Sequence, residues 1–284
     1  MADQLVQDLL EAGIHFGQKK SAWNPRMKPY IWGTRNRIHI IDIRQTIRGL
    51  LLAKKFVTQT VASGKSVVFV GTKRQARSSI ETHCGETGMP WVTERWLGGT
   101  LTNFRTIRER LKRLVELEGL VESGEIETYS KKMTSQLMRE KRKITRNLQG
   151  IRNMNSHPGA VFVVDSTREI NAIREAKLLG IPTIALIDTD GNPEHVDIPI
   201  PGNDDSMRSI DVIVQTLSDA VMAGMAMRGA NAEQDETADE PKEKKPKRRS
   251  SRSQFSAAKE DSSASTGTEE TAPEAVAETT TDQN

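Results

Sequence analysis

Residues 15–48 combine cationic and aromatic side chains at a density that suits contact with nucleic acid. Eight Lys or Arg residues stand against a single acid, Asp42, and four of the twelve aromatic rings of the chain lie among them. Cations at this density bind phosphates and release counterions, and rings can stack on unpaired bases. The glycines and prolines of the segment predict an irregular backbone that follows a folded RNA surface. The sequence therefore predicts an RNA-binding arm.

Two shorter basic stretches add to this interface. Residues 71–77 lie where a strand passes into a helix, so that free backbone N–H groups and cations can hold a phosphate. Residues 95–103 lead through a glycine turn into a helix with Asn103 as its N-cap, and Arg95 either contacts RNA or packs over Trp96. The candidate RNA-binding residues are His15, Phe16, Lys19, Lys20, Trp23, Asn24, Arg26, Lys28, Tyr30, Arg35, Arg37, Lys73, Arg74, Arg77, Arg95, Asn103 and Arg105.

The rings of the arm also have a purely structural interpretation. Trp23, Tyr30 and Trp32 can anchor a loop-rich segment to the core instead of stacking on bases. That interpretation is weaker for the basic set as a group, because burying many unpaired cations is costly.

One pair of carboxylates has the spacing of a catalytic site. Asp188 and Asp190 follow the apolar run 184–187. The pattern resembles the aspartyl-nucleophile motif of haloacid-dehalogenase-type phosphatases, in which the first carboxylate attacks phosphorus and the second acts as acid and base. Asp204 and Asp205 resemble a magnesium pair. A magnesium-dependent phosphatase is therefore the alternative function.

Three features argue against that alternative. Asn192 stands where the phosphatase motif has threonine, the motif falls late in the chain, and little folded sequence follows it. Residues 188–193 also suit a tight turn after a strand, and Asp204 and Asp205 suit the start of a helix.

Composition excludes several classes of protein. Cys84 is the only cysteine, which excludes a disulfide framework, and five scattered His residues leave little for a zinc site. The first residues lack the features of a signal peptide, and no apolar run approaches the ~20 residues of a membrane span. We expect a reduced cytoplasmic location, no metal or cofactor, no small-molecule substrate and no contact with a membrane.

Charge is distributed unevenly along the chain. Residues 231–284 hold 8 Lys or Arg and 13 Asp or Glu, a net charge of −5, so the total of +3 leaves +8 on residues 1–230. A cationic body favours a polyanionic partner, although a solvated basic surface would show the same excess. The acidic segment 231–284 has too little apolar surface to fold, and we expect a disordered tail.

Residues 64–230 alternate between apolar runs and amphipathic stretches, as in an α/β domain with a parallel sheet covered on both faces. The expected strands are 66–71, 90–92, 160–165, 182–187 and, weakly, 196–198. The expected helices are 4–12, 44–63, 73–86, 168–179 and 206–227.

One interval has helical periodicity and no strand. Between residues 103 and 154, apolar residues recur at spacings of three and four, from Ile107 to Leu114 and again from Met133 to Ile151. The pattern predicts two antiparallel helices with a narrow apolar stripe, which form a projecting hairpin over 105–155. A hairpin of this kind is also suited to recruiting a protein partner.

Six segments in one order resemble bacterial small-subunit ribosomal protein two, along nearly all of residues 1–230. The departures are modest: Gln149 replaces a glycine and His157 replaces a proline. The matching segments are 9–17, 24–31, 71–73, 95–103, 158–182 and 198–205.

The resemblance implies a flavodoxin-like domain with strand order 2-1-3-4-5 and a coiled-coil hairpin inserted after its second strand. It implies a structural, non-catalytic role in the small ribosomal subunit, between head and body, with small-subunit rRNA and neighbouring ribosomal proteins as partners. Docking of small-subunit ribosomal protein one is part of that role. The expected division of the chain is an arm with the first part of the α/β domain at 1–104, the hairpin at 105–155, the second part of the domain at 156–230 and the tail at 231–284.

Overall fold

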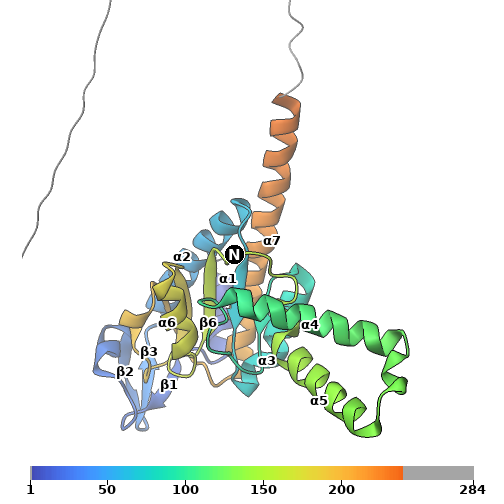
Figure 1. The fold of residues 1–284 in the computed structure, drawn as a ribbon. Coiled ribbons are helices and arrows are strands. Elements are labelled where there is room, and N and C mark those ends of the chain that lie inside the picture. The colour runs from blue at the N-terminus through green and yellow to red at the C-terminus, as the bar shows by residue number, and fades with distance from the viewer. Residues whose placement is uncertain (1, 239–284) are drawn as a thin grey trace, which may run out of the picture. The chain divides into compact units, whose positions relative to one another are not determined.

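The computed structural model describes residues 2–238, and Figure 1 shows the course of the chain. The acidic segment predicted as a tail lies outside these residues from position 239 onward. The helices are α1 (Ala2–Glu11), α2 (Ile43–Ala62), α3 (Arg74–Thr87), α4 (Phe104–Glu122), α5 (Lys131–Leu148), α6 (Ile170–Leu178) and α7 (Met207–Ala238), with 3-10 turns η1 (Pro25–Tyr30), η2 (Glu125–Thr128), η3 (Gln149–Ile151) and η4 (Pro193–His195). The strands are β1 (Phe16–Lys19), β2 (Ile31–Arg35), β3 (Ile38–Ile41), β4 (Val67–Val70), β5 (Trp91–Val92), β6 (Ala160–Val164), β7 (Thr183–Ile187) and β8 (Ile198–Pro201).

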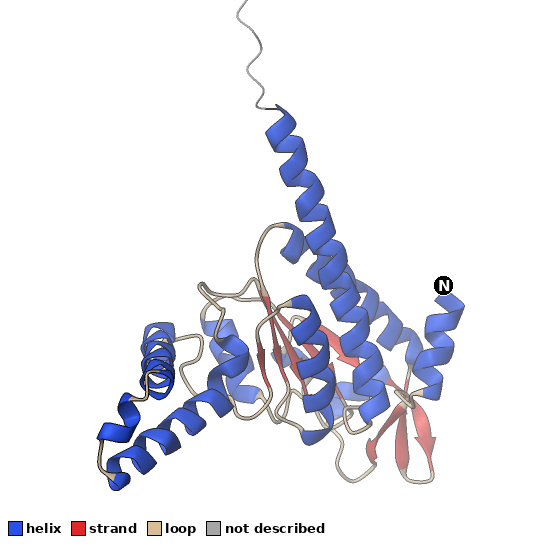
Figure 2. Ribbon diagram, turned by 90° about the vertical axis from the view of Figure 1, so that its right-hand side faces the viewer, coloured by secondary structure: helices blue, strands red, loops and turns tan. Residues whose placement is uncertain are grey.

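Five strands form a parallel sheet in the order β5-β4-β6-β7-β8. The three central strands β4, β6 and β7 are buried at every position, as expected for uniformly apolar strands with helices on both faces. Figure 2 shows helices on both sides of this sheet. The predicted α/β class with a parallel sheet is confirmed.

Side chains alternate between two cores along each strand. Phe69 and Phe162 point to the face covered by α2, α3 and α7, and their rings meet edge to face at 5.4 Å. Val161 and Val163 point to the other face, which α6 and the bases of α4 and α5 cover. Both cores are built by the same strands because successive strand residues face opposite sides.

Two boundaries differ from those expected. The last strand is Ile198–Pro201, two residues later than predicted, and it accommodates Pro199 and Pro201 because it pairs on one side only, with β7. Helix α7 continues to Ala238, past the boundary expected at residue 231.

The stretch Met207–Gly229 of α7 is long and apolar enough to cross a membrane, with a mean hydropathy of 1.3, which the sequence analysis did not anticipate. Its apolar side chains have a place in the core, however. Ile210, Ile213, Leu217 and Val221 are fully buried against the sheet and the neighbouring helices. The composition of this stretch therefore reflects a core helix.

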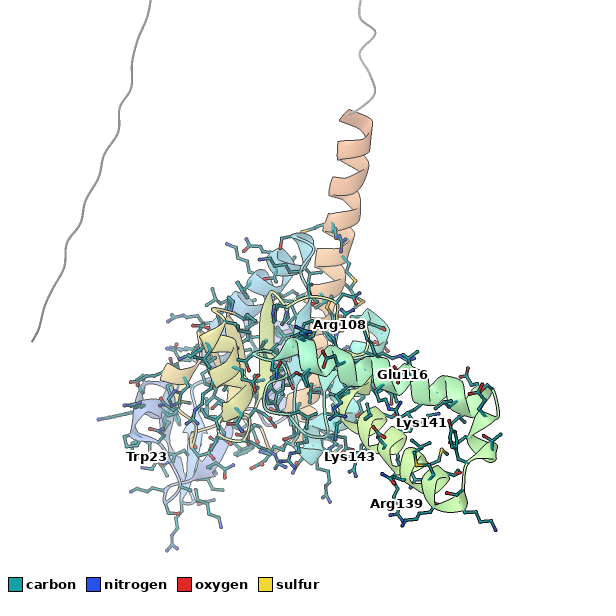
Figure 3. The ribbon with its side chains drawn as sticks, viewed as in Figure 1. Trp23, Arg108, Glu116, Arg139, Lys141 and Lys143 are labelled. Atoms are coloured by element: carbon teal, nitrogen blue, oxygen red, sulfur yellow. The ribbon has the colours of Figure 1, made fainter. Side chains whose placement is uncertain are left out.

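Helices α4 and α5 extend away from the sheet side by side (Figures 1 and 3). Leu111, Leu114 and Leu117 of α4 and Leu137 of α5 are buried along their contact, and Arg113 Nε lies 3.7 Å from Glu140 Oε1 across it. The predicted apolar stripe is shorter than expected. Met133 is 41% exposed, because the chain between the helices widens their separation through η2.

The N-terminal arm, predicted as irregular, contains a three-stranded antiparallel sheet in the order β1-β3-β2. Its β2–β3 turn places Asn36 and Arg37 at φ of +51° and +65°. Two successive residues of positive φ are the mark of a type I′ hairpin, and asparagine favours it. Each pairing in this sheet contains a register shift, which is why period-two alternation was hard to see in the sequence.

A buried carboxylate fixes the loop that leads into α4. Glu175 of α6 accepts hydrogen bonds from Trp96 Nε1 at 3.0 Å and from the backbone N–H groups of Gly99 at 2.8 Å and Leu101 at 3.0 Å. Burial by itself would raise the pKa of Glu175, but these hydrogen bonds outweigh it and hold the pKa below its usual value. The loop is therefore tied to α6 by an ionised side chain.

We expect Glu175→Gln to lower the free energy of unfolding by about 2–3 kcal/mol, because the amide presents an N–H group to backbone donors that need an acceptor. Urea denaturation measures the change. The matched control is Glu122→Gln, at an exposed position at the end of α4, which is expected to shift the free energy by less than about 0.5 kcal/mol. Equal stability of the two variants would contradict this role of Glu175.

Candidate nucleic-acid interface

The cations of the arm gather around the β2–β3 turn and the end of β1. Lys19, Lys20, Arg35 and Arg37 are all exposed, and the backbone N–H of Lys20 donates to the Arg37 carbonyl at 2.9 Å. This bond holds the end of β1 beside the turn. The four side chains therefore share one small surface, and no ion pair links them to a carboxylate within residues 2–238.

Other polar candidates of the arm are partly engaged. Arg26 is exposed but lies 2.5 Å from Glu194 of η4. Asn24 caps η1, with its side-chain oxygen accepting from the backbone N–H of Arg26. Lys28 is exposed on the same turn. Asn24 thus shapes the backbone, and Lys28 remains open to solvent.

The rings of the arm divide into two kinds. Trp32 is 77% exposed and Phe16 is 48% exposed. Trp23, by contrast, is half-buried with its ring 5.2 Å from His39, and Tyr30 is half-buried against the second core. Trp23 and Tyr30 therefore act as anchors, whereas Phe16 and Trp32 are the rings available to a partner. Figure 3 shows Trp23 on the arm.

Trp32 was not among the candidates, although the sequence offers a signal for it. It lies on β2 after the partly buried Ile31, and alternation along a strand would have placed it on the opposite, exposed face. Trp32 and His15 line a cavity of about 350 Å³ whose other walls are Ile40, Ile41, Asp42, Ile43 and Arg44.

His15 lies beside this cavity without contributing a charge. Its ring is 4.1 Å from Phe16, and its Nδ1 is buried without a hydrogen-bond partner. Burial lowers its pKa, which favours the neutral imidazole. His15 is therefore a packing partner of Phe16, and its contact with RNA stays a prediction.

At the phosphate site expected at residues 71–77, the side chain of Lys73 belongs to a cluster of ion pairs. The Lys73 ammonium lies 2.7 Å from Asp204 Oδ1, 2.5 Å from Asp205 Oδ1 and 3.7 Å from Asp165 Oδ2. Burial lowers the pKa of Lys73, but these carboxylates raise it by more, and the net pKa is raised. Lys73 is therefore committed to carboxylates and is a poor ligand for phosphate.

The remaining candidate residues near the sheet differ in whether their side chains already have a partner within the chain. Arg77 pairs with Glu94 at 2.9 Å, and Arg105 pairs with Glu109 at 3.4 Å. Asn103 is exposed and makes no side-chain cap to its helix; its side-chain oxygen accepts from the Thr106 hydroxyl instead. Arg74 and Arg95 are exposed. Of this group, Arg74 and Arg95 are the cations that no carboxylate of residues 2–238 engages.

The arm is docked on the carboxyl edge of the sheet through Gln18. Its side-chain amide donates to Asp188 Oδ2 at 3.2 Å and Asp205 Oδ2 at 2.6 Å, and its backbone N–H donates to Thr189 Oγ1 at 2.9 Å. Gly17 beside it leaves no room for a side chain, because a Cβ would lie 2.6 Å from Thr189 Cγ2. The arm therefore covers Asp188 and Thr189 of the phosphatase-like motif, whereas Asp190 stays exposed.

The position of the arm also determines how accessible the carboxylates near that motif are. Asp188, Asp204 and Asp205 bring oxygen atoms within 4.8 Å of one another, the kind of grouping that a cation can occupy. A nucleophile needs access to its substrate, however, and Asp188 is only 2% exposed beneath the arm. Burial raises the pKa of Asp188 to about 7, and the nearby Asp190 and Asp205 add to the shift.

The sequence matches one family model and is similar to several known proteins. Residues 9–224 match the family model described as ribosomal protein S2. The small ribosomal subunit protein uS2 of Rhodopirellula baltica is 58% identical over 224 residues, 79% of this chain and 86% of that protein. That of Syntrophobacter fumaroxidans is 49% identical over 243 residues, 86% of this chain and 87% of that protein, and that of Treponema pallidum is 46% identical over 244 residues, 84% of each.

These relatives define a class, the proteins of the small ribosomal subunit. The chain belongs to the ribosomal protein S2 family. The resemblance expected from the six sequence segments is thereby confirmed.

The raised pKa of Asp188 predicts a pH dependence of stability. An unfolded aspartate has lost its proton above pH ~4, while the folded Asp188 keeps it up to about pH 7. The free energy of unfolding therefore falls as the pH rises between these values, by on the order of 2 kcal/mol from pH 5 to pH 7.5 for this group. Asp188→Asn is expected to remove this contribution to the decrease in the free energy of unfolding.

Denaturation of the variant and the parent protein at both pH values measures the difference. Asp219→Asn, at an exposed position on α7, serves as the control and is expected to keep the parent's pH dependence. An unchanged dependence in Asp188→Asn would show that this carboxyl is not the group concerned.

Proposed function

We propose that this protein is a structural constituent of the small ribosomal subunit that binds rRNA at the junction of head and body through the arm of residues 15–48. The observation that carries the proposal is the exposed cluster of Lys19, Lys20, Arg35 and Arg37 on a folded turn. A turn fixed by backbone hydrogen bonds presents cations with little loss of entropy on binding, which favours contact with phosphates. The site of action is the cytoplasmic ribosome.

The proposal includes the type of α/β fold, the nature of the hairpin and the division of the chain into domains. The strand order β5-β4-β6-β7-β8 supports a flavodoxin-like domain, in which the first strand of the sheet lies second from the edge. The buried stripe between α4 and α5 supports a coiled-coil hairpin. We keep the division into 1–104, 105–155 and 156–230 as the corresponding domain proposal.

Docking of small-subunit ribosomal protein one is the second part of the proposed role. Phe16 and Trp32 expose large apolar surface beside the cavity of about 350 Å³, and such patches typically contact proteins. The basic face of α5, formed by the exposed side chains of Arg139, Arg142 and Lys143, is the other surface open to a protein partner; Figure 3 labels Arg139 and Lys143.

The phosphatase alternative finds no support in the arrangement of the arm. A phosphate ester would have to displace Gln18 to reach Asp188, and Asp204 and Asp205 are already paired with Lys73. We therefore propose no catalytic activity. Incubation of the purified protein with magnesium and a generic phosphate ester tests this: turnover lost in Asp188→Asn would reinstate the enzyme.

The electrostatic part of the proposal predicts a salt dependence. The logarithm of the affinity for small subunits lacking this protein is expected to fall linearly with the logarithm of the salt concentration. Replacing Lys19, Lys20, Arg35 and Arg37 together with Gln is expected to reduce the slope by about 3, since each phosphate contact contributes about 0.7–0.9. Sedimentation binding at several salt concentrations gives the slope.

The matched control replaces four exposed cations outside the arm, Lys54, Lys55, Arg174 and Arg208, with Gln. It removes the same net charge and is expected to change the slope by less than 1. If both fourfold variants change the slope equally, net charge and not the arm governs binding.

The partner proposal predicts that Phe16→Ser with Trp32→Ser weakens retention of ribosomal protein one on small subunits more than tenfold, because buried aromatic anchors contribute about 2 kcal/mol each. The salt slope for rRNA is expected to stay unchanged. Co-sedimentation of ribosomal protein one with reconstituted subunits measures the effect.

Two controls separate the possible surfaces. Leu51→Ser with Leu52→Ser removes a similarly exposed apolar pair on α2 and is expected to have no effect. Replacing Arg139, Arg142 and Lys143 with Gln tests the hairpin. Loss of ribosomal protein one in the hairpin variant alone would move the docking surface from the arm to α5.

A further inference from the structure

A cavity of about 550 Å³ lies at the amino ends of strands β4 and β6, on the opposite edge of the sheet from the arm. Its floor consists of buried apolar groups, among them Met89, Met154 and Cys84. Burial raises the pKa of the Cys84 thiol, so this side chain stays protonated and behaves as a small apolar wall. Trp91 adds a half-buried ring to the lining.

Polar groups line the same cavity above this floor. Gln149, Asn153 and Asn155 come from η3 and the loop that follows it. Arg108 Nη1 donates to Asn155 Oδ1 at 2.9 Å and to the Asn155 carbonyl at 3.1 Å, which orients that side chain and leaves its amide N–H groups for another acceptor. The cavity thus joins an apolar floor to amides that can read a hydrogen-bonding edge.

A single cation completes the lining. Arg228 comes from α7, and its guanidinium lies near Gly64 at the start of the cavity wall. No ion pair ties Arg228 to a carboxylate in the described part of the chain. A guanidinium without a carboxylate partner is suited to a phosphate group.

Gly85 lines the cavity from α3 and offers a position at which a side chain can be added. It lies inside α3, where glycine costs roughly 0.5–1 kcal/mol relative to alanine. Its φ is not in the left-handed region, and no atom lies within 4 Å of the position a Cβ would take. A side chain added at this position therefore meets no atom of residues 2–238 and enters the open space of the cavity that Gly85 lines.

We propose that this cavity binds one unstacked nucleotide. The base lies on the floor beside Trp91, its hydrogen-bonding edge meets the amides of Asn153 and Asn155, and its phosphate meets Arg228. Single unstacked nucleotides are recognised in this way, through a ring face, a polar edge and a cation. The nucleotide is either free or a nucleotide of an RNA strand turned out of its stack. The site stands independently of the arm and its rRNA contact.

Gly85→Leu tests the proposal with little risk to folding. The leucine side chain meets open space at this position, and leucine is a better helix former than glycine. It is expected to weaken binding of adenosine and uridine 5′-monophosphates to the full chain at least tenfold, as measured by calorimetry. The matched control is Gly119→Leu inside α4, where a Cβ also meets open space, and it is expected to change the affinity less than twofold.

Arg228→Gln provides a second measurement. It is expected to weaken binding of the monophosphates at least fivefold and to leave binding of the nucleosides adenosine and uridine unchanged. Equal effects on nucleosides and monophosphates would overturn the assignment of Arg228 to the phosphate.

Binding of a single-stranded hexanucleotide distinguishes the two sources of the bound nucleotide, a free nucleotide and an RNA strand. If Gly85→Leu weakens binding of the hexanucleotide but the monophosphates do not bind, the nucleotide comes from an RNA strand. If monophosphates bind and the variant abolishes this, free nucleotides are ligands as well. Absence of binding, or affinities that Gly85→Leu leaves unchanged while the fourfold arm variant lowers them, would overturn the proposal and leave the arm's role intact.

Discussion

The ion cluster around Lys73 is the constraint on which the arrangement of this protein depends. A lysine side chain that is 12% exposed would be unstable alone, because burial removes the hydration of its ammonium. Asp165 from the end of β6 and Asp204 and Asp205 from the loop before α7 compensate for that loss, and Lys73 in turn relieves their mutual repulsion. Gln18 joins the cluster from the arm. Four segments far apart in the sequence are thus held at one point.

The cluster also explains why the carboxyl edge of the sheet does not serve as an open ligand site. In open α/β sheets this edge is where ligands usually bind. Here the arm lies over it, with Gly17 against Thr189 and Gln18 on Asp188. The exposed cations of the arm lie away from this edge, on the β2–β3 turn and the end of β1.

The parallel sheet could be predicted from the sequence because its strands are apolar at every position, a pattern that local composition determines. The arm sheet could not, since its strands mix polar and apolar residues and shift register. The role of Lys73 was missed for a different reason: its neighbours in sequence are cationic or neutral, and the carboxylates that surround it lie more than ninety positions away. The cations of the arm are exposed, and their contact with RNA stays a prediction. Only the tertiary packing distinguishes Trp23 and Tyr30 from the exposed Phe16 and Trp32.

The insertion of the hairpin between neighbouring strands has a consequence for how the chain folds. Strand β4 pairs directly with β6, although the residues between them include β5 and both hairpin helices. Closing so long a loop costs entropy before any pairing is gained, and it slows folding of sheets built from distant partners. Helices α4 and α5 can form and pair through local contacts within microseconds. Pairing of the two helices brings the ends of the hairpin together, and this shortens the effective loop between β4 and β6.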